Sequence, residues 1–343
     1  MRMRAALVVA FMAAAFAAHA GTIRIATWHL ELDRAGPGLL LRDIGRGDDP
    51  RLAAIAGVIG AVAPDVLVVQ GVDYDLRLRA LAALRDRIAE AGPHYPHIFA
   101  RRPNSGWPTG LDMDGDGRRG GPGDAQGYGR FSGQGGLAIL SRYPLDEAAA
   151  LEFSAMLWRD LPGALLPRWP DGRAFPSEEA QAVQRLSSVA HWAVPVVLGS
   201  GPLVLLAFHA TTPVFDGPED RNGRRNADEI RFWQLYLDGA FGPAPAGRFA
   251  IIGDANLDPE RGEGRRGAIR ALLDDPRLRD PLPGRATVEW EATGPLRVSY
   301  ILPSADLTVA GAGIYWPEEG APGHAAAVTA GPHRLVWVDL ALE

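Results

Sequence analysis

The sequence predicts an α/β protein with a mixed β-sheet, and two observations support this fold class. Apolar runs typical of buried strands alternate along the chain with stretches whose apolar residues recur at helical spacing. Two successive strand patterns, residues 192–198 and 203–208, are separated only by Gly199-Ser200-Gly201-Pro202, which is typical of a β-hairpin. A hairpin makes its strands antiparallel, whereas a strand–helix–strand connection makes them parallel, so a sheet containing both is mixed.

The expected elements cover most of the chain. Strands are expected at residues 22–28, 65–70, 136–140, 192–198, 203–208, 249–252, 298–302 and 335–340. Helices are expected around Leu52, Ile55, Ile59 and Val62, around Leu76, Leu81, Leu84 and Ile88, and over residues 226–237 and 265–273. Residues 101–135 are polar and rich in glycine, which predicts a long loop, and loops of this length are usually functional or mobile.

The N-terminal segment has the pattern of an export signal. Arg2 and Arg4 precede an apolar stretch that ends in Ala18-His19-Ala20, a small-x-small cleavage site. The stretch is short for a membrane span of ~20 residues, so we expect a cleaved signal peptide at residues 1–20. The mature protein, residues 21–343, is then expected to be one domain in the periplasm or outside the cell, without a membrane anchor and monomeric.

Composition limits the kinds of partner and the sources of stability. The chain has 343 residues and no cysteine, so a large core must provide its stability without disulfides. All 35 basic residues are arginine, against 41 acidic residues, and the net charge is −6. An acidic chain does not attract nucleic acid through its overall field, so any contact with a polyanion must be local.

The most informative motif lies at the end of an apolar run, where Phe249–Ile252 leads into Gly253-Asp254-Ala255-Asn256. Residues i and i+2 of an extended chain lie on the same side, so Asp254 and Asn256 are expected to project together. A carboxylate and an amide placed in this way suit a hard metal ion and a phosphate oxygen. An Asx turn after a strand explains the same residues, and this segment alone leaves both interpretations open.

Seven short segments in order resemble the endonuclease/exonuclease/phosphatase family of deoxyribonuclease-like hydrolases. They are Ile25-Ala26-Thr27-Trp28, residues 64–70, residues 140–144, Phe208-His209-Ala210, residues 253–256, residues 297–303 and His333-Arg334-Leu335-Val336. The resemblance covers nearly all of the mature chain. It implies a four-layer α-β-β-α sandwich, in which two packed mixed β-sheets are flanked by helices. It also implies chemistry in which a metal ion polarises a phosphate and histidine acts on water or on the phosphoryl oxygen.

The resemblance carries a set of site residues onto this chain. The positions that match are His209, Asp254, Asn256 and His333 as catalytic residues, with Asp254 also as a ligand of Mg²⁺ or Mn²⁺. The positions that depart are His29, Gly71, Ser299 and Pro332, where the family has asparagine, glutamate, aspartate and aspartate. Loss of two metal carboxylates and of the acid that orients a catalytic histidine predicts a weak metal site.

A charged segment follows the strand that ends at His209 and should therefore lie on the rim of the site. We expect Arg221, Asn222, Arg224 and Arg225 to bind phosphate, because the planar guanidinium group pairs well with phosphate oxygens. The alternative is a solvated, self-paired loop leading into a helix.

The long loop contains a second candidate metal site. Asp112, Asp114 and Asp116, followed by Gly117, match positions one, three, five and six of a calcium-binding loop, although position twelve is Gly123. Three neighbouring carboxylates repel one another unless a cation lies between them. We expect a structural Ca²⁺ here, the alternative being a solvated turn.

Two functional hypotheses follow. The first is a divergent, exported, metal-dependent phosphoesterase, a nuclease- or phosphodiesterase-like hydrolase with a degraded active site, acting on a phosphate ester or nucleic-acid-like substrate. The second is a catalytically inactive family member that serves as a secreted, calcium-stabilised binding module. The four departures at the catalytic positions motivate the second hypothesis.

Overall fold

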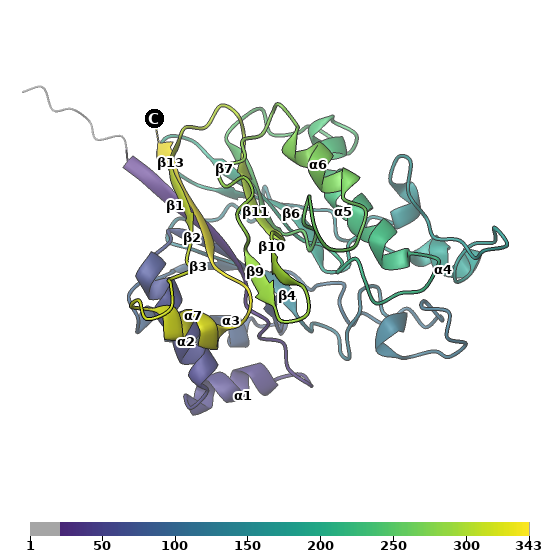
Figure 1. The fold of residues 1–343 in the computed structure, drawn as a ribbon, viewed down its shortest axis with the longest axis horizontal. Coiled ribbons are helices and arrows are strands. Elements are labelled where there is room, and N and C mark those ends of the chain that lie inside the picture. Colours follow the sequence, from purple (N-terminus) through teal and green to yellow (C-terminus); the bar gives the residue numbers. More distant parts are fainter. Residues whose placement is uncertain (1–20, 343) are drawn as a thin grey trace, which may run out of the picture.

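The computed structural model of the protein describes residues 21–342, in which two β-sheets pack face to face (Figure 1). The signal peptide predicted for residues 1–20 lies outside the described residues. Across residues 21–342, no helix combines the length and apolar character needed to cross a bilayer.

The first sheet has six strands in the order β12-β13-β1-β2-β4-β3. Their bounds are β1 Gly21–His29, β2 Val66–Val72, β3 His97–Phe99, β4 Gly136–Ser141, β12 Val309–Ile314 and β13 Val336–Leu342. Strands β1 and β2 are parallel, and the other neighbours are antiparallel. The sheet is therefore mixed, as predicted.

The second sheet has five strands in the order β11-β8-β7-β6-β5. Their bounds are β5 Leu151–Glu152, β6 Ala190–Val196, β7 Leu203–His209, β8 Phe249–Asp254 and β11 Ser299–Pro303. The β6–β7 pair is the antiparallel hairpin expected from the sequence, while β7 and β8 are parallel. A separate two-stranded ribbon pairs β9, Val288–Trp290, with β10, Gly294–Leu296.

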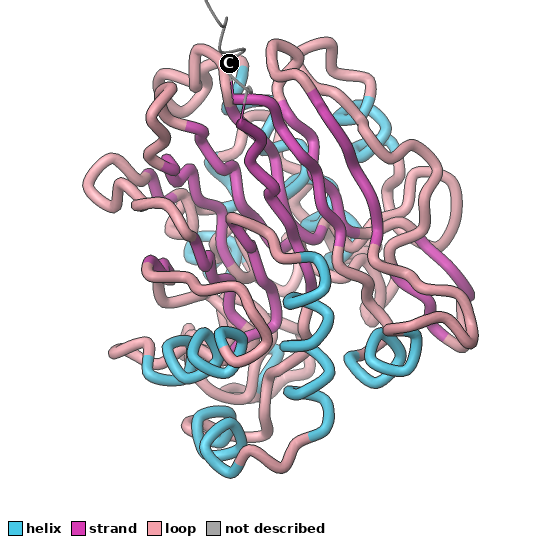
Figure 2. Tube along the Cα trace, turned by 90° about the vertical axis from the view of Figure 1, so that its left-hand side faces the viewer, coloured by secondary structure: helices cyan, strands magenta, loops and turns pink. Residues whose placement is uncertain are grey.

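Helices lie outside the two sheets and complete the four-layer sandwich (Figures 1 and 2). The helices are α1 Leu39–Arg46, α2 Pro50–Val62, α3 Arg79–Ala89, α4 Glu178–Val183, α5 Arg221–Leu237, α6 Gly267–Leu273 and α7 His324–Ala330. Helices α1, α2, α3 and α7 pack together beside the first sheet, and α5 packs on α6 beside the second. The predicted fold class is confirmed.

Apolar side chains on the facing surfaces of the two sheets form the central core. Ile25 of β1, Val194 of β6 and Ile252 of β8 belong to one continuous buried cluster, and β1 and β2 lie directly against β8. A second cluster lies between the other face of the second sheet and α5, centred on Phe232 and Trp233. Burial of both faces explains why these strands read as continuous apolar runs in the sequence.

Some element boundaries differ from the prediction. Helix α5 begins at Arg221, five residues before the predicted start, and Leu76 lies outside α3 with 87 % of its surface exposed. Strand β12 was not predicted because Val-Ala-Gly-Ala-Gly-Ile contains mainly small residues that carry no strand signal. Residues 101–135 are irregular apart from one short 3₁₀ turn, as expected.

Candidate active site

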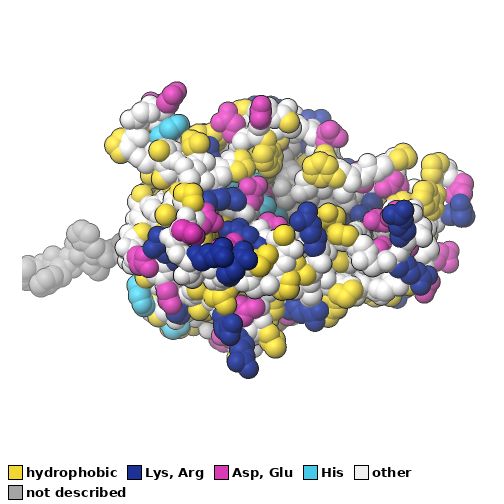
Figure 3. Space-filling view, turned by 90° about the horizontal axis from the view of Figure 1, so that it is seen from below, with side chains coloured by type: hydrophobic (Ala, Val, Ile, Leu, Met, Phe, Trp, Pro, Cys, Tyr) yellow, Lys and Arg dark blue, Asp and Glu magenta, His cyan; other side chains and the backbone are white. Residues whose placement is uncertain are grey.

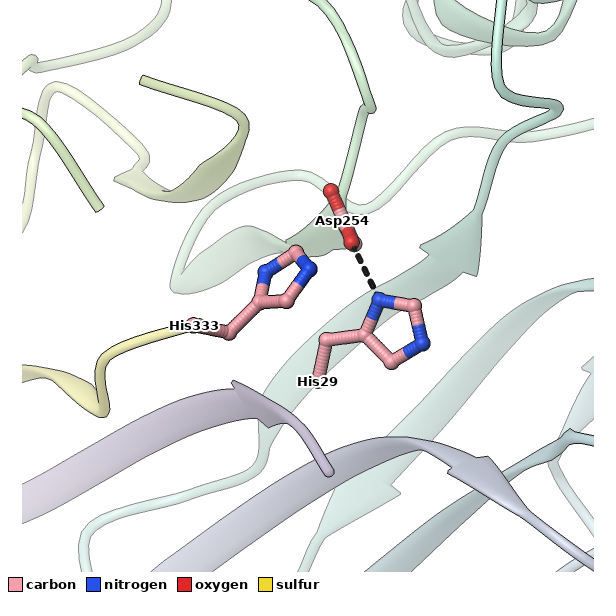
Figure 4. Close-up of side chains that lie close together, drawn as sticks. All are labelled: His29, Asp254 and His333. Atoms are coloured by element: carbon pink, nitrogen blue, oxygen red, sulfur yellow. Dashed lines mark hydrogen bonds and ion pairs between the residues drawn. The ribbon is translucent and has the colours of Figure 1, made fainter. Parts of the chain in front are cut away.

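Polar side chains from both sheets converge where their strands end, and Figure 4 shows three of them, His29, Asp254 and His333. His29 ends β1 and His333 precedes β13 in the first sheet, while His209 ends β7 and Asp254 ends β8 in the second. Ligand atoms of His29, Asp254 and His333 all lie within 4.8 Å of one another. The ring of His29 also lies 4.7 Å from that of His209 and 4.5 Å from that of His333, centre to centre. The proximity expected for Asp254 and His333 is therefore present.

Asp254 is fully buried and is held from two directions. Its Oδ1 accepts a hydrogen bond from the backbone N–H of Asn256 at 2.9 Å, and its Oδ2 lies 2.8 Å from Nδ1 of His29. Asn256 donates its side-chain amide to the carbonyl of Ala210. The Asx turn is therefore present and fixes a carboxylate that also faces the histidines, while binding of a metal ion or phosphate by this segment stays a prediction.

Gly253 explains why the motif begins with glycine. Its φ is 152°, and a Cβ at this position would lie 2.0 Å from the carbonyl oxygen of Phe208 in the neighbouring strand. No other residue fits there without moving the backbone. The close approach of β8 to β7 brings Asp254 into register with His209.

The departures at positions 29 and 71 occupy one space. Gly71 has φ of 73°, and a Cβ there would lie 2.8 Å from Cδ2 and Nε2 of His29 and 2.8 Å from the backbone nitrogen of Glu31. The imidazole ring therefore fills the space through which the glutamate of the family would project. Relative to the family, histidine replaces asparagine at position 29 and glycine replaces glutamate at position 71. Together the two changes put a nitrogen donor where the family has an oxygen donor.

His29 and Asp254 form a buried ion pair. Burial acts to lower the pKa of His29, but the hydrogen bond and charge of Asp254, together with Glu31 and Asp33, outweigh it and raise that pKa. Burial acts to raise the pKa of Asp254, but the His29 hydrogen bond and the surrounding histidines lower it to about 2. The hydrogen bond therefore favours the ionised form of the pair, imidazolium and carboxylate.

The other two histidines are neutral. Burial, followed by repulsion from the His29 cation, lowers the pKa of His209 to about 3, and the same causes lower the pKa of His333 to about 3. The Nδ1 atoms of both rings are buried and have no hydrogen-bond partner among the described residues. Ser299, opposite Asp254 on β11, also has a buried hydroxyl without a partner there. The orienting contact that an aspartate would give His333 is missing.

Nearby residues fix the position of His333 and pack against its ring. Trp28 donates its indole N–H to the carbonyl of His333, and Trp290 lies edge-on to the ring at 5.3 Å. Glu31 places Oε1 3.8 Å from Nε2 of His333 and binds Arg51 through Oε2. Glu31 is thus a second carboxylate at the edge of the cluster.

The acids that follow Gly71 serve other purposes. Asp73 accepts hydrogen bonds from the backbone of Arg34 and Gly135, and burial raises its pKa to about 6 despite those bonds. Asp75 accepts from the backbone of Arg77 and Ala80 at the start of α3. Neither carboxylate belongs to the histidine cluster.

A cleft of about 590 Å³ borders the cluster and collects residues from distant segments. His29 and His209 line it, together with parts of the long loop and of residues 210–225. Tyr128 and Phe215 also line it and remain 69 % and 90 % exposed. Arginines and acidic side chains lie interspersed on the face of the molecule in Figure 3.

The segment expected to bind phosphate lies on this cleft but is largely committed to the protein itself. Arg221 donates to the carbonyl of Met113, and Asn222 donates its side-chain amide to the carbonyl of Val214. Arg224 donates to the carbonyl of Glu219. Arg225 is buried, and its guanidinium donates to the carbonyls of Gln126, Arg185, Leu186 and Ser187. Of the four residues, Arg221, Asn222 and Arg225 line the cleft, so their phosphate-binding role stays a prediction.

The three aspartates of the long loop also lie together. Side-chain oxygens of Asp112, Asp114 and Asp116 lie within 4.8 Å of one another, so the group could hold a metal ion. Burial, then the charges of Asp124 and Asp116, raise the pKa of Asp114. Position twelve has no room for a glutamate, because a Cβ on Gly123 would lie 1.9 Å from Oδ2 of Asp114.

Two mixed sheets packed face to face, with acid and histidine side chains gathered at their strand ends, define the α-β-β-α sandwich class of hydrolases. The chain belongs to the endonuclease/exonuclease/phosphatase family, whose model matches residues 39–331. Enzymes of this family typically use divalent metal ions. No curated protein matches the chain.

Solved structures show the same fold at low sequence identity. An endonuclease/exonuclease/phosphatase from Beutenbergia cavernae DSM 12333 is 19 % identical, covering 94 % of this chain and 72 % of that one, with a TM-score of 0.56. A family protein from Leptotrichia buccalis C-1013-b is 15 % identical, covering 92 % and 98 %, with a TM-score of 0.53. One from Bacteroides thetaiotaomicron is 13 % identical, covering 94 % and 98 %, with a TM-score of 0.51.

The donor set of the histidine cluster does not fit Mg²⁺. That ion requires near-octahedral coordination by oxygen, and the cluster provides one buried carboxylate, Asp254, among three imidazole rings. The Mg²⁺ or Mn²⁺ expected from the sequence therefore stays a prediction. From the sequence, His29 was interpreted only as a departure from the family pattern. Its position at the end of a strand is the same signal that identified His209 as a site residue.

Proposed function

We propose that this protein is a divergent, exported phosphoesterase of the endonuclease/exonuclease/phosphatase family. The observation that carries the proposal is the meeting of His29, His209, Asp254 and His333, from strands of both sheets, beside a cleft. Clustered ionisable groups with strongly shifted pKa values, placed at a cleft, are typical of catalytic sites. Export rests on the signal pattern of residues 1–20, and the proposed location of the mature chain is the periplasm or the outside of the cell. We propose separately that the chain is a monomer.

The different charge states of the side chains give them different roles in hydrolysis. Positive charge at His29, held by Asp254, faces the cleft and offsets the negative charge that gathers on the phosphoryl oxygens. The neutral rings of His209 and His333 retain a lone pair, so either can accept a proton from the attacking water. Water then forms the new P–O bond while the bond to the leaving oxygen breaks, and the proton taken up by the histidine passes to that oxygen to give the alcohol.

The proposed substrate is a phosphate ester that enters the cleft from the side of the long loop. The net charge of −6 and the mixed charges on the face in Figure 3 give no long-range attraction for a polyanion. Arg221 is the arginine that lies on the cleft without full burial. A short nucleic acid or a small phosphodiester fits this local charge better than a long duplex.

The test is a survey of hydrolysis by the mature chain. Bis(nitrophenyl) phosphate, nitrophenyl phosphate, single-stranded DNA and RNA are incubated with each of several divalent metal ions. We expect turnover that falls at least ~10²-fold in His209→Ala and in Asp254→Ala. Turnover should be unchanged in His94→Asn, which alters an exposed histidine outside the site. Turnover that survives in both site variants would contradict the assignment.

A catalytically inactive, calcium-stabilised binding module is the second candidate function. The loop aspartates favour it, because their oxygens lie close enough to share an ion. We propose Ca²⁺ as that ion, since a cluster of carboxylates suits a hard cation. Absence of turnover with every substrate and metal, combined with calcium binding, would support this function over the phosphoesterase.

A further inference from the structure

We propose that His29, Asp254 and His333 form a nitrogen-rich site for a transition-metal ion such as Zn²⁺. This site rests on the proposed phosphoesterase and names its metal. With the ion bound, its charge would replace that of the His29 imidazolium, and His209 would be the ring left to accept a proton from water. It departs from the oxygen-donor site that the glutamate at position 71 and the aspartate at position 332 would complete in the family.

Geometry supports a single shared ion. Two atoms bound to one Zn²⁺ at about 2.0–2.1 Å lie about 3.3 Å apart in a tetrahedral site. Nδ1 of His29 and Oδ2 of Asp254 are 2.8 Å apart, and all three ligand atoms lie within 4.8 Å of one another. Small shifts of the rings therefore suffice to surround an ion.

The chemistry of the donors selects the class of metal. Imidazole nitrogen suits Zn²⁺ and other late transition metals, whereas Mg²⁺ and Ca²⁺ prefer oxygen. Two imidazoles and one carboxylate, with a further position open, form a common arrangement in catalytic zinc sites. Glu31, whose Oε1 lies 3.8 Å from Nε2 of His333, adds an oxygen at the edge.

An unpaired nitrogen provides an independent observation. Nδ1 of His333 is buried without a hydrogen-bond partner among residues 21–342, and this residue is 2 % exposed. A buried polar atom without a partner costs stability, and coordination to a metal satisfies such an atom.

The backbone at position 71 explains how the nitrogen donor is accommodated. His29 stands where a Cβ on Gly71 would lie, at 2.8 Å from two ring atoms. A glutamate at 71 and the observed ring of His29 therefore exclude each other. Asp254 keeps its second oxygen bound to the backbone of Asn256, which holds the carboxylate in place for an ion.

The experiment measures metal binding directly on the mature chain. Protein stripped with a chelator is titrated with Zn²⁺ and with Co²⁺, and the metal content is measured by elemental analysis after dialysis. We expect one Zn²⁺ per chain that a hundredfold excess of Mg²⁺ does not displace. We also expect a Co²⁺ visible spectrum typical of four or five ligands that include nitrogen.

Variants locate the ion. His29→Asn, His333→Asn and Asp254→Asn should each weaken Zn²⁺ binding at least ~10²-fold, whereas His94→Asn, which alters an exposed histidine outside the site, should leave it unchanged. Circular dichroism and urea unfolding test whether each variant is folded. If one of the three site variants does not fold, the other two still locate the ion.

Two results would overturn the proposal. One is Zn²⁺ that binds no more tightly than Mg²⁺, and the other is tight binding that persists in every folded site variant. Because metal content is measured without substrate, a zinc-loaded protein that hydrolyses nothing refutes the phosphoesterase alone. Hydrolysis by a protein that binds no Zn²⁺ refutes the metal site alone.

Discussion

The space shared by His29 and Gly71 allows a quantitative test of how the cluster is built. Gly71 adopts φ of 73°, a left-handed conformation that costs other residues about 1–2 kcal/mol. A Cβ there would also lie 2.8 Å from two ring atoms of His29 and from the backbone nitrogen of Glu31, and overpacking of this kind costs about 1–3 kcal/mol. Gly71→Ala should therefore lower the free energy of unfolding by about 2–5 kcal/mol.

A double-mutant cycle separates the two contributions. His29→Ala removes the ring contacts but leaves the backbone conformation and the contact with Glu31. Gly71→Ala should then cost less in the His29→Ala background, with a coupling of about 0.5–3 kcal/mol. Gly47→Ala is the matched control, since Gly47 has φ of 70° and no atom near the position of a Cβ. Urea unfolding of the mature chain, with a chelator present, measures all the variants.

Either of two results would refute this reasoning. The first is a Gly71→Ala variant that loses no more stability than Gly47→Ala, since a space filled by a ring must resist a new side chain. The second is a coupling of zero, because the cost would then be independent of His29.

Three further predictions concern other parts of the molecule. Calcium should raise the melting temperature of the wild type relative to chelator but not that of Asp114→Ala, and equal melting curves for the wild type would contradict the loop site. Burial, then the charge of Arg225, lower the pKa of His191 to about 4 against the pull of a Glu229 carbonyl. Between pH 6.5 and 4 only the unfolded state gains this proton, so lowering the pH reduces the free energy of unfolding of the wild type. In His191→Gln this loss should be smaller by about 1.4 kcal/mol per pH unit. Equal slopes for the two proteins in urea unfolding across this range would exclude this role of His191. Arg225→Ala should cost about 2–4 kcal/mol by urea unfolding because it leaves buried carbonyls unpaired, whereas Arg224→Ala should cost less than about 0.5 kcal/mol.

Strand ends were the part of the site that the sequence could predict. Asp254 and His209 each follow an apolar run, and parallel neighbouring strands bring such ends together. His333 joins them from the other sheet, and the family resemblance, rather than the local pattern, placed it there. The α/β class with a mixed sheet followed from the alternation of strands and helices, and the two-sheet sandwich followed from the family resemblance.

The role of His29 and the use of the arginines could not be predicted in this way. A glycine at position 71 shows that a side chain is missing but not what fills its space, which depends on a contact between two strands. Arg225 sits in a charged stretch that reads as solvent-exposed, yet α5 begins early enough to turn it inward onto four carbonyls. Both outcomes depend on tertiary contacts that no local pattern encodes.

The energetics of the cluster bear on the choice between the two candidate functions. A buried ion pair and two buried neutral histidines with unpaired nitrogens are less stable than apolar side chains of similar volume. A cleft that only bound a partner would gain stability from apolar replacements at these positions. Here the carboxylate is kept and a third imidazole, His29, occupies the space left by the missing glutamate. Retention of costly, chemically competent groups is typical of functional sites, which is an argument for the proposed phosphoesterase over the proposed binding module.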